Sequence, residues 1–264
     1  MGELIFVGLG LGGPMDMSRR AFECLREADE VFAEFYTSTL VDCSPRDLER
    51  ALERPVTVLD RSGVEEGNVI LESARKGKVA FMTAGDTMAA TTHVDLRIRA
   101  MGEGIPTRLI HGVSIFTAAA SALGLQSYKF GRTVTLPFQE ENYFPTSPYD
   151  NIKENWERGL HTLVLLDINE DEGRYMSSKQ AVEWLIEAEN RVEGGMISNT
   201  TLICAAARVG SVTEQVAAGF PSRMMEIDMG PPLHCLVIPG RLHFMEARSL
   251  VDLAGAPMDI LEDE

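Results

Sequence analysis

Three glycines near the start of the chain have the spacing of a loop that brings backbone close to a bound ligand. Gly8, Gly10 and Gly13 form G-x-G-x-x-G directly after the apolar run 4–7, which reads as a buried strand. Glu34 follows a second apolar run about 20 residues further on, where nicotinamide enzymes place the acid that binds the ribose. The spacing alone fits a dinucleotide site, and it also fits a tight strand-to-helix turn that binds nothing.

The residues after these glycines favour a ligand other than NAD. In a dinucleotide site the helix starts at the glycines, and its N-terminus faces the pyrophosphate. Here Asp16 and Ser18 are the better N-caps, which predicts a later helix start, although Pro14 would suit an earlier one. Asp16 would also place a carboxylate beside a doubly charged pyrophosphate, whereas a zwitterionic or cationic ligand tolerates that charge.

Two later segments carry residue types suited to binding at the carboxyl ends of strands. Asp86 follows the apolar run 79–83, and it could cap a helix beginning near Ala89 or accept hydrogen bonds from a ribose or an amine. The segment 112–115 (GVSI) precedes a helix of small residues, which allows close approach of backbone and ligand. His111, alone at a strand end, is interpreted as a structural hydrogen-bonding residue.

The elements that position these residues alternate between short apolar runs and helical patterns. This predicts an α/β fold with mainly parallel strands in the first half and helices at 19–28 and 179–191. A composition shift divides the chain into an N-terminal α/β domain at 1–112 and a C-terminal α/β domain at 128–264, joined by 113–127. The expected strands are 4–7, 31–35, 56–59, 79–83, 107–110, 133–136, 162–168, 201–206 and 235–238.

Composition excludes several classes of partner. A formal net charge of -16 offers no basic stripe for nucleic acid or anionic lipid, so neither nucleic acid nor membrane is expected as a partner. The four cysteines form no C-x-x-C pair, so the sequence predicts no disulfide framework and no metal site. No signal peptide, myristoylation motif or membrane span is expected, which predicts a cytoplasmic protein.

Three segments together resemble the S-adenosylmethionine site of the tetrapyrrole-methylase superfamily: VGLGLGG, TAGDTMAATTH and HGVSIF. The resemblance implies two α/β domains of the tetrapyrrole-methylase type, with the cofactor in the cleft between the domains. Thr87 is a departure, because the superfamily commonly has proline after Gly-Asp. By position, the cofactor contacts implied are Leu11, Asp86, Ala89, Ser114, Ile115, Leu166, Val209 and His234.

Longer segments are similar to one archaeal branch of that superfamily, which methylates a modified histidine of translation elongation factor 2. They are residues 32–38, 128–138, 142–168 and 230–257. The resemblance implies trimethylation of the amino group of a 3-amino-3-carboxypropyl arm, S-adenosyl-L-homocysteine as the second product, and a homodimer. The open alternatives are a methylase of a small tetrapyrrole precursor, a nicotinamide-dependent oxidoreductase and a regulatory domain that senses the cofactor.

Candidates for contacting the substrate arm are Glu34, Tyr36 and Asp167, and the two carboxylates could instead be caps or ion-pair partners. No residue is assigned as general base. Aromatic side chains at the entrance of the site would bind a trimethylammonium product through cation–π interactions. Packing in the hydrophobic core of a loop explains the same residues equally well. The aromatic residues in question are Tyr36, Tyr143, Phe144 and Tyr149.

Overall fold

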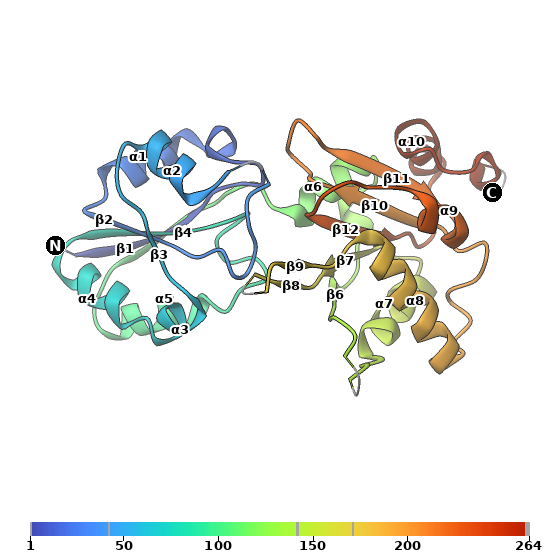
Figure 1. Ribbon diagram of the computed structural model, residues 1–264, viewed down its shortest axis with the longest axis horizontal. Helices are drawn as coiled ribbons and strands as arrows, with labels where there is room; N and C mark the ends of the chain where they lie inside the picture. The colour runs from blue at the N-terminus through green and yellow to red at the C-terminus, as the bar shows by residue number, and fades with distance from the viewer. Residues whose placement is uncertain (1, 42, 141–142, 171, 262–264) are drawn as a thin grey trace. The chain divides into compact units, whose positions relative to one another are not determined.

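The computed structural model describes residues 2–41, 43–140, 143–170 and 172–261, and it divides into two compact units. Unit 1 runs to Ile115 and includes Glu170 and Glu172, whereas unit 2 takes the remainder from Phe116. Each unit has its own five-stranded sheet, blue to green in unit 1 and green to red in unit 2 (Figure 1). Asn142, at the start of the segment 142–168, lies outside the described residues.

Unit 1 is built on a fully parallel sheet in the order β3-β2-β4-β1-β5. The carboxyl ends of its strands therefore share one edge, where α/β sheets bind ligands. The strands are β1 (Glu3–Gly8), β2 (Glu30–Ala33), β3 (Thr57–Val58), β4 (Lys78–Thr83) and β5 (Thr107–Ile110).

Helices cover both faces of this sheet (Figure 1). Side chains alternate along the strands, so Ala33 and Met82 pack with α1 and α2, whereas Phe32 and Phe81 pack with α3, α4 and α5. The helices are α1 (Arg19–Glu27), α2 (Pro45–Leu52), α3 (Arg61–Glu66), α4 (Asn68–Lys76) and α5 (Val94–Gly102), with a 3-10 turn η1 at Pro14–Asp16.

Unit 2 contains a mixed sheet in the order β11-β10-β12-β7-β6, in which only the β6–β7 pair is parallel. The strands are β6 (Val134–Leu136), β7 (Thr162–Leu166), β10 (Ile203–Ala207), β11 (Gln215–Gly219) and β12 (His234–Ile238), and β8 (Ile168–Asn169) pairs with β9 (Arg174–Tyr175) as a separate ribbon. The helical segments are α6 (Ile115–Leu123), η2 (Ser127–Lys129), α7 (Ser147–Glu157), α8 (Ser178–Val192), α9 (Pro221–Glu226), α10 (Phe244–Ala254) and η3 (Met258–Leu261). Among the described residues, no helix is both long and apolar enough to cross a bilayer.

Several expected boundaries shift for local reasons. The strand expected at 31–35 ends at Ala33, because the Glu34 side chain bonds Thr37 and turns the chain. The strand expected at 162–168 breaks at Asp167, whose carboxylate accepts the backbone N–H of Ile168 at 3.0 Å. Strand β11 was not predicted, since its sequence QVAAG lacks the β-branched run typical of strands.

Two expectations about helix starts have opposite outcomes. The late start of α1 is confirmed, with Ser18 as N-cap accepting from the N–H of Ala21. The helix expected near Ala89 is wrong, because α5 begins only at Val94. Ala90 has a left-handed φ of 55°, which interrupts any helix there. Asp86 is consequently not a helix cap.

Candidate functional site

Three glycines at the carboxyl edge of the unit 1 sheet pack backbone against backbone. They are Gly8 at the end of β1, Gly85 after β4 and Gly112 after β5. A Cβ added to Gly112 would lie 2.4 Å from the carbonyl oxygen of Gly85, and one added to Gly8 would lie 2.7 Å from the N of Gly112. Gly10 and Gly85 also exchange backbone hydrogen bonds of 3.1 and 2.7 Å. The glycines are therefore required to let three loops converge.

Asp16 completes the first of these loops. Its carboxylate accepts the N–H of Gly12 at 2.6 Å, within the turn between β1 and α1. Asp16, whose negative charge disfavours a bound pyrophosphate, therefore also stabilises the conformation of the glycine loop.

Asp86 joins the second and third loops. Its carboxylate accepts the N–H of Thr87 at 2.8 Å and that of Gly112 at 3.3 Å, and it lies 3.0 Å from Nδ1 of His111. His111 is thus a hydrogen-bonding partner, as interpreted from the sequence. The Asp86 side chain keeps 25% of its surface exposed, which leaves carboxylate oxygen accessible to a ligand hydroxyl.

Four of the predicted cofactor contacts lie on these three loops, which follow the adjacent strands β1, β4 and β5, and a fifth, Ile115, begins helix α6 directly after the third loop. They combine one carboxylate with apolar side chains and a hydroxyl, and all are half-buried. Such a set suits a ligand with both apolar and polar parts. The five residues are Leu11, Asp86, Ala89, Ser114 and Ile115.

The other three predicted contacts lie together at one end of the unit 2 sheet. Cys235 pairs with Leu165, so His234 and Leu166 are the next residues of β12 and β7 at that end. The N–H of Arg208 bonds the carbonyl of Leu233 at 2.8 Å, which places Val209 just beyond the same edge. Contact of these three residues with a cofactor stays a prediction.

His234 is held in one tautomer. Its Nδ1 accepts the N–H of Ser178 at 3.1 Å, so Nε2 carries the proton and donates it to the carbonyl of Pro231 at 3.0 Å. Burial lowers the pKa of His234. A neutral ring with both nitrogens bonded is suited to shaping a binding surface and not to proton transfer.

Glu34 is fully buried at the end of β2. Its carboxylate accepts the N–H of Thr37 at 3.0 Å and the Thr37 hydroxyl, and one oxygen lies 3.6 Å from Nε2 of His93. Burial raises the pKa of Glu34, and the bonds from Thr37 oppose that rise. Nothing in the sequence pattern had singled out His93, which lies 59 positions further along the chain.

His93 gives the protein a specific acid sensitivity. Burial lowers the pKa of His93 to about 4, whereas an unfolded histidine titrates near about 6.5. As pH falls through this window the unfolded chain gains a proton that the folded protein does not, so stability falls. Denaturant titrations at about pH 7 and about pH 5 should show a smaller loss for His93→Gln than for the unaltered chain. Equal losses would contradict this assignment.

Other predicted substrate contacts have structural partners. Asp167 accepts the N–H groups of Phe138 and Ile168 and so joins β6 to β7. Tyr149 is fully buried and donates its hydroxyl to Glu189, and Phe144 stacks on Trp184 with ring centroids 4.7 Å apart. Tyr149 and Phe144 therefore belong to the core of unit 2 and do not form an aromatic entrance to the site.

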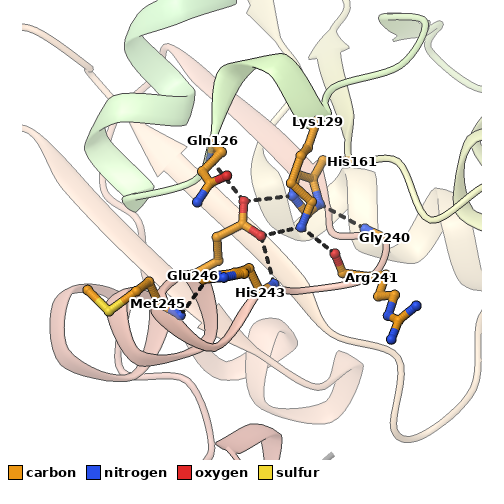
Figure 2. Close-up of polar contacts among 8 residues, drawn as sticks. All are labelled: Gln126, Lys129, His161, Gly240, Arg241, His243, Met245 and Glu246. Atoms are coloured by element: carbon orange, nitrogen blue, oxygen red, sulfur yellow. Dashed lines mark hydrogen bonds and ion pairs between the residues drawn. The ribbon is translucent and has the colours of Figure 1, made fainter. Parts of the chain in front are cut away.

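A buried carboxylate organises a second polar network in unit 2 (Figure 2). Glu246, 1% exposed, accepts hydrogen bonds from the N–H of Gln126, the N–H of His243 and the ammonium of Lys129. His161 accepts the N–H of Gly240 on Nδ1, so its Nε2 donates to Glu246 at 3.1 Å. Burial alone would raise the pKa of Glu246, but these donors lower it to about 2.

Comparison with known proteins shows the family to which this chain belongs. The model of the family Tetrapyrrole (Corrin/Porphyrin) Methylases matches residues 3–219. The chain is 46% identical over 259 residues to the diphthine synthase of Methanothermobacter thermautotrophicus, covering 98% of each protein. It is 44% identical over 260 residues to that of Methanosphaera stadtmanae, covering 98% of this chain and 99% of the relative. The chain belongs to the diphthine synthases.

A solved structure agrees with this membership. A crystal structure of a diphthine synthase superposes with a TM-score of 0.89 at 36% identity, covering 98% of each chain. The expected α/β tetrapyrrole-methylase fold is thereby confirmed, and the chain is a methyltransferase. The comparisons favour this reading over a nicotinamide-dependent oxidoreductase, although the glycine spacing fits both.

Proposed function

We propose that the chain transfers methyl groups from S-adenosyl-L-methionine to the amino group of a 3-amino-3-carboxypropyl histidine on translation elongation factor 2. Three transfers give diphthine, an intermediate in diphthamide biosynthesis, and leave S-adenosyl-L-homocysteine. The observation that carries the proposal is the match to diphthine synthases over 98% of the chain at 46% identity. A protein that shared only one domain with the diphthine synthases would match them over only part of that length.

The residues at the carboxyl edge of the unit 1 sheet suit this cofactor. Asp86 offers an accessible carboxylate for ribose hydroxyls, and Leu11, Ala89 and Ile115 offer apolar surface for an adenine. In unit 2 we assign contacts to Leu166, Val209 and His234. A carboxylate-bearing site of this kind tolerates a sulfonium cation better than a pyrophosphate.

Methyl transfer requires chiefly that the acceptor amine and the methyl group are aligned. S-adenosyl-L-methionine supplies an electrophilic methyl group when bound. The protein has to hold the acceptor amine in line with that group and to shield both from water. The amine must also be neutral to attack, so a proton leaves it before each transfer. We place Glu34 and Tyr36 near the substrate arm and leave Asp167 as a structural residue of unit 2.

We further propose that the protein works in the cytoplasm as a homodimer, with elongation factor 2 as its protein partner. The four cysteines are free thiols, which fits a reducing compartment. The dimer is carried over from the superfamily resemblance, and size-exclusion chromatography with light scattering tests it. A monomeric mass that persists at high protein concentration would contradict it.

Asp86→Ala should weaken cofactor binding about tenfold to a hundredfold, because it removes a ligand acceptor and the bond to Gly112. Calorimetric titration with S-adenosyl-L-homocysteine measures the change, and circular dichroism checks that the fold is retained. The control is Asp95→Ala, whose side chain is 70% exposed and pairs with Arg99. Unchanged affinity in Asp86→Ala would remove Asp86 from the site.

The identity of the cofactor is tested by thermal melting. Saturating S-adenosyl-L-homocysteine should raise the melting temperature by several degrees, because it binds only the folded protein. NAD(H) should have no effect. Stabilisation by NAD(H) alone would overturn the proposed function.

A further inference from the structure

Buried polar atoms without hydrogen-bond partners gather in one part of unit 1. Among the described residues seven buried side-chain nitrogen or oxygen atoms lack a partner, and five of them lie in the segments 34–37 and 83–93. They are the hydroxyl oxygens of Tyr36, Thr83 and Thr87 and both ring nitrogens of His93. Leaving such groups unbonded costs stability, so a concentration of them calls for an explanation.

Tyr36, Thr83 and His93 lie on one face of the unit 1 sheet, and Thr87 follows in the loop after β4. Phe32 pairs with Phe81 and both point toward α3, α4 and α5, so Glu34 and Thr83, two positions further along, continue that face. The ring of His93 packs edge-on against Phe81 with centroids 5.0 Å apart, and it lies 3.6 Å from the Glu34 carboxylate. We call Glu34, Tyr36, Thr83, Thr87 and His93 the buried polar cluster.

The cluster combines opposite kinds of hydrogen-bonding group. Glu34 is a carboxylate, whereas the three hydroxyls and the imidazole of His93 can each donate. Such a set complements a zwitterion, because the carboxylate attracts an ammonium and the donors bind a second carboxylate. Tyr36 is half-buried, whereas the other four members of the cluster are buried.

We propose that the buried polar cluster binds the amino-acid end of the substrate arm, an ammonium beside a carboxylate. This inference rests on the proposed function. Glu34 receives the ammonium, and the hydroxyls of Thr83 and Thr87 donate to the carboxylate. Thr87 follows Asp86 directly, so one loop presents groups for both the cofactor and the substrate. The assignment also explains why Thr87 stands where the superfamily commonly has proline. Threonine has a hydroxyl that can donate a hydrogen bond, whereas proline has none.

The test is a pair of near-isosteric substitutions, Thr83→Val and Thr87→Val. Each removes an unbonded buried hydroxyl, so each should leave the melting temperature unchanged or raise it. If the hydroxyls bind substrate, each variant should raise KM for elongation factor 2 carrying the aminocarboxypropyl histidine about tenfold. Affinity for S-adenosyl-L-homocysteine, measured by calorimetry, should remain within about twofold.

Thr162→Val is the matched control, since Thr162 is also fully buried but its hydroxyl accepts a bond from Asn155 at 2.9 Å. It should lower the melting temperature and leave KM unchanged. If Thr83→Val and Thr87→Val both had the KM of the unaltered enzyme, and that enzyme showed normal turnover, this inference would be overturned and the proposed function would stand. Absence of any turnover by the unaltered enzyme would overturn the proposed function and this inference with it.

Discussion

Glu246→Ala is expected to lower the free energy of unfolding of unit 2 by about 3–5 kcal/mol. The substitution leaves the Lys129 ammonium without its carboxylate and the buried Nε2–H of His161 without an acceptor. It also removes the capping interaction with the N–H of His243 at the start of α10. These losses fall on three segments that the carboxylate joins, 126–129, the start of β7 at 161–162 and the start of α10 at 243–246 (Figure 2). Denaturant unfolding followed by tryptophan fluorescence measures the change.

Glu187→Ala provides the comparison for that experiment. Glu187 pairs with Arg191 on α8, and the two side chains are 39% and 45% exposed. An exposed pair of this kind contributes about 1 kcal/mol or less. If Glu246→Ala were no more destabilising than Glu187→Ala, the buried network would not hold unit 2 together.

Gly112→Ala is expected to reduce affinity for S-adenosyl-L-homocysteine at least about tenfold and to destabilise unit 1 by about 1–3 kcal/mol. The new Cβ would lie 2.4 Å from the Gly85 carbonyl oxygen and 2.8 Å from the carbonyl carbon of Gly8. Because these neighbours are backbone atoms, they cannot move aside as a side chain can, and the three loops must separate. Calorimetry and thermal melting report the two effects.

Gly102→Ala is the control for the added methyl group. A Cβ on Gly102 meets nothing within 4 Å, and the residue ends helix α5 without a positive φ. This variant should bind the cofactor as the unaltered chain does and should be as stable or slightly more stable. Equal affinities for Gly102→Ala and Gly112→Ala would show that the glycine contact does not shape the site.

The sequence predicted the first half of the fold well because local signals agree there. The central strands β1 and β4 of unit 1 are apolar runs, and Ser18 marks the start of α1. It predicted less about the chain after β4, since the left-handed Ala90 that delays α5 has no local signature. The small residues of β11 likewise carry no strand signal, and the neighbouring strand β10 determines that conformation.

The site could be located from sequence only in part. Glycines and an aspartate after strands predicted that these residues converge at one edge of unit 1, as they do, because parallel strands bring their carboxyl ends together. The partners of the buried carboxylates could not be found in this way. Glu246 binds Gln126 across 120 positions of the chain, and Glu34 lies beside His93 across 59. Pairings over such separations depend on the tertiary fold.

Glycine spacing illustrates why a motif needs its structural context. Gly8, Gly10 and Gly13 satisfy the dinucleotide fingerprint, yet Gly8 is there because Gly85 and Gly112 approach its backbone. We propose that the residues at the edge that these glycines create, Asp86 foremost, select the ligand. The same spacing therefore serves a methyltransferase here.

The most direct measurement of the central claim is methyl transfer to the protein substrate. The chain would be incubated with methyl-labelled S-adenosyl-L-methionine and elongation factor 2 carrying the aminocarboxypropyl histidine, and the modified peptide would be analysed by mass spectrometry. The account predicts label on the amino group of that arm, up to three methyl groups. Label on a tetrapyrrole but none on elongation factor 2 would contradict it.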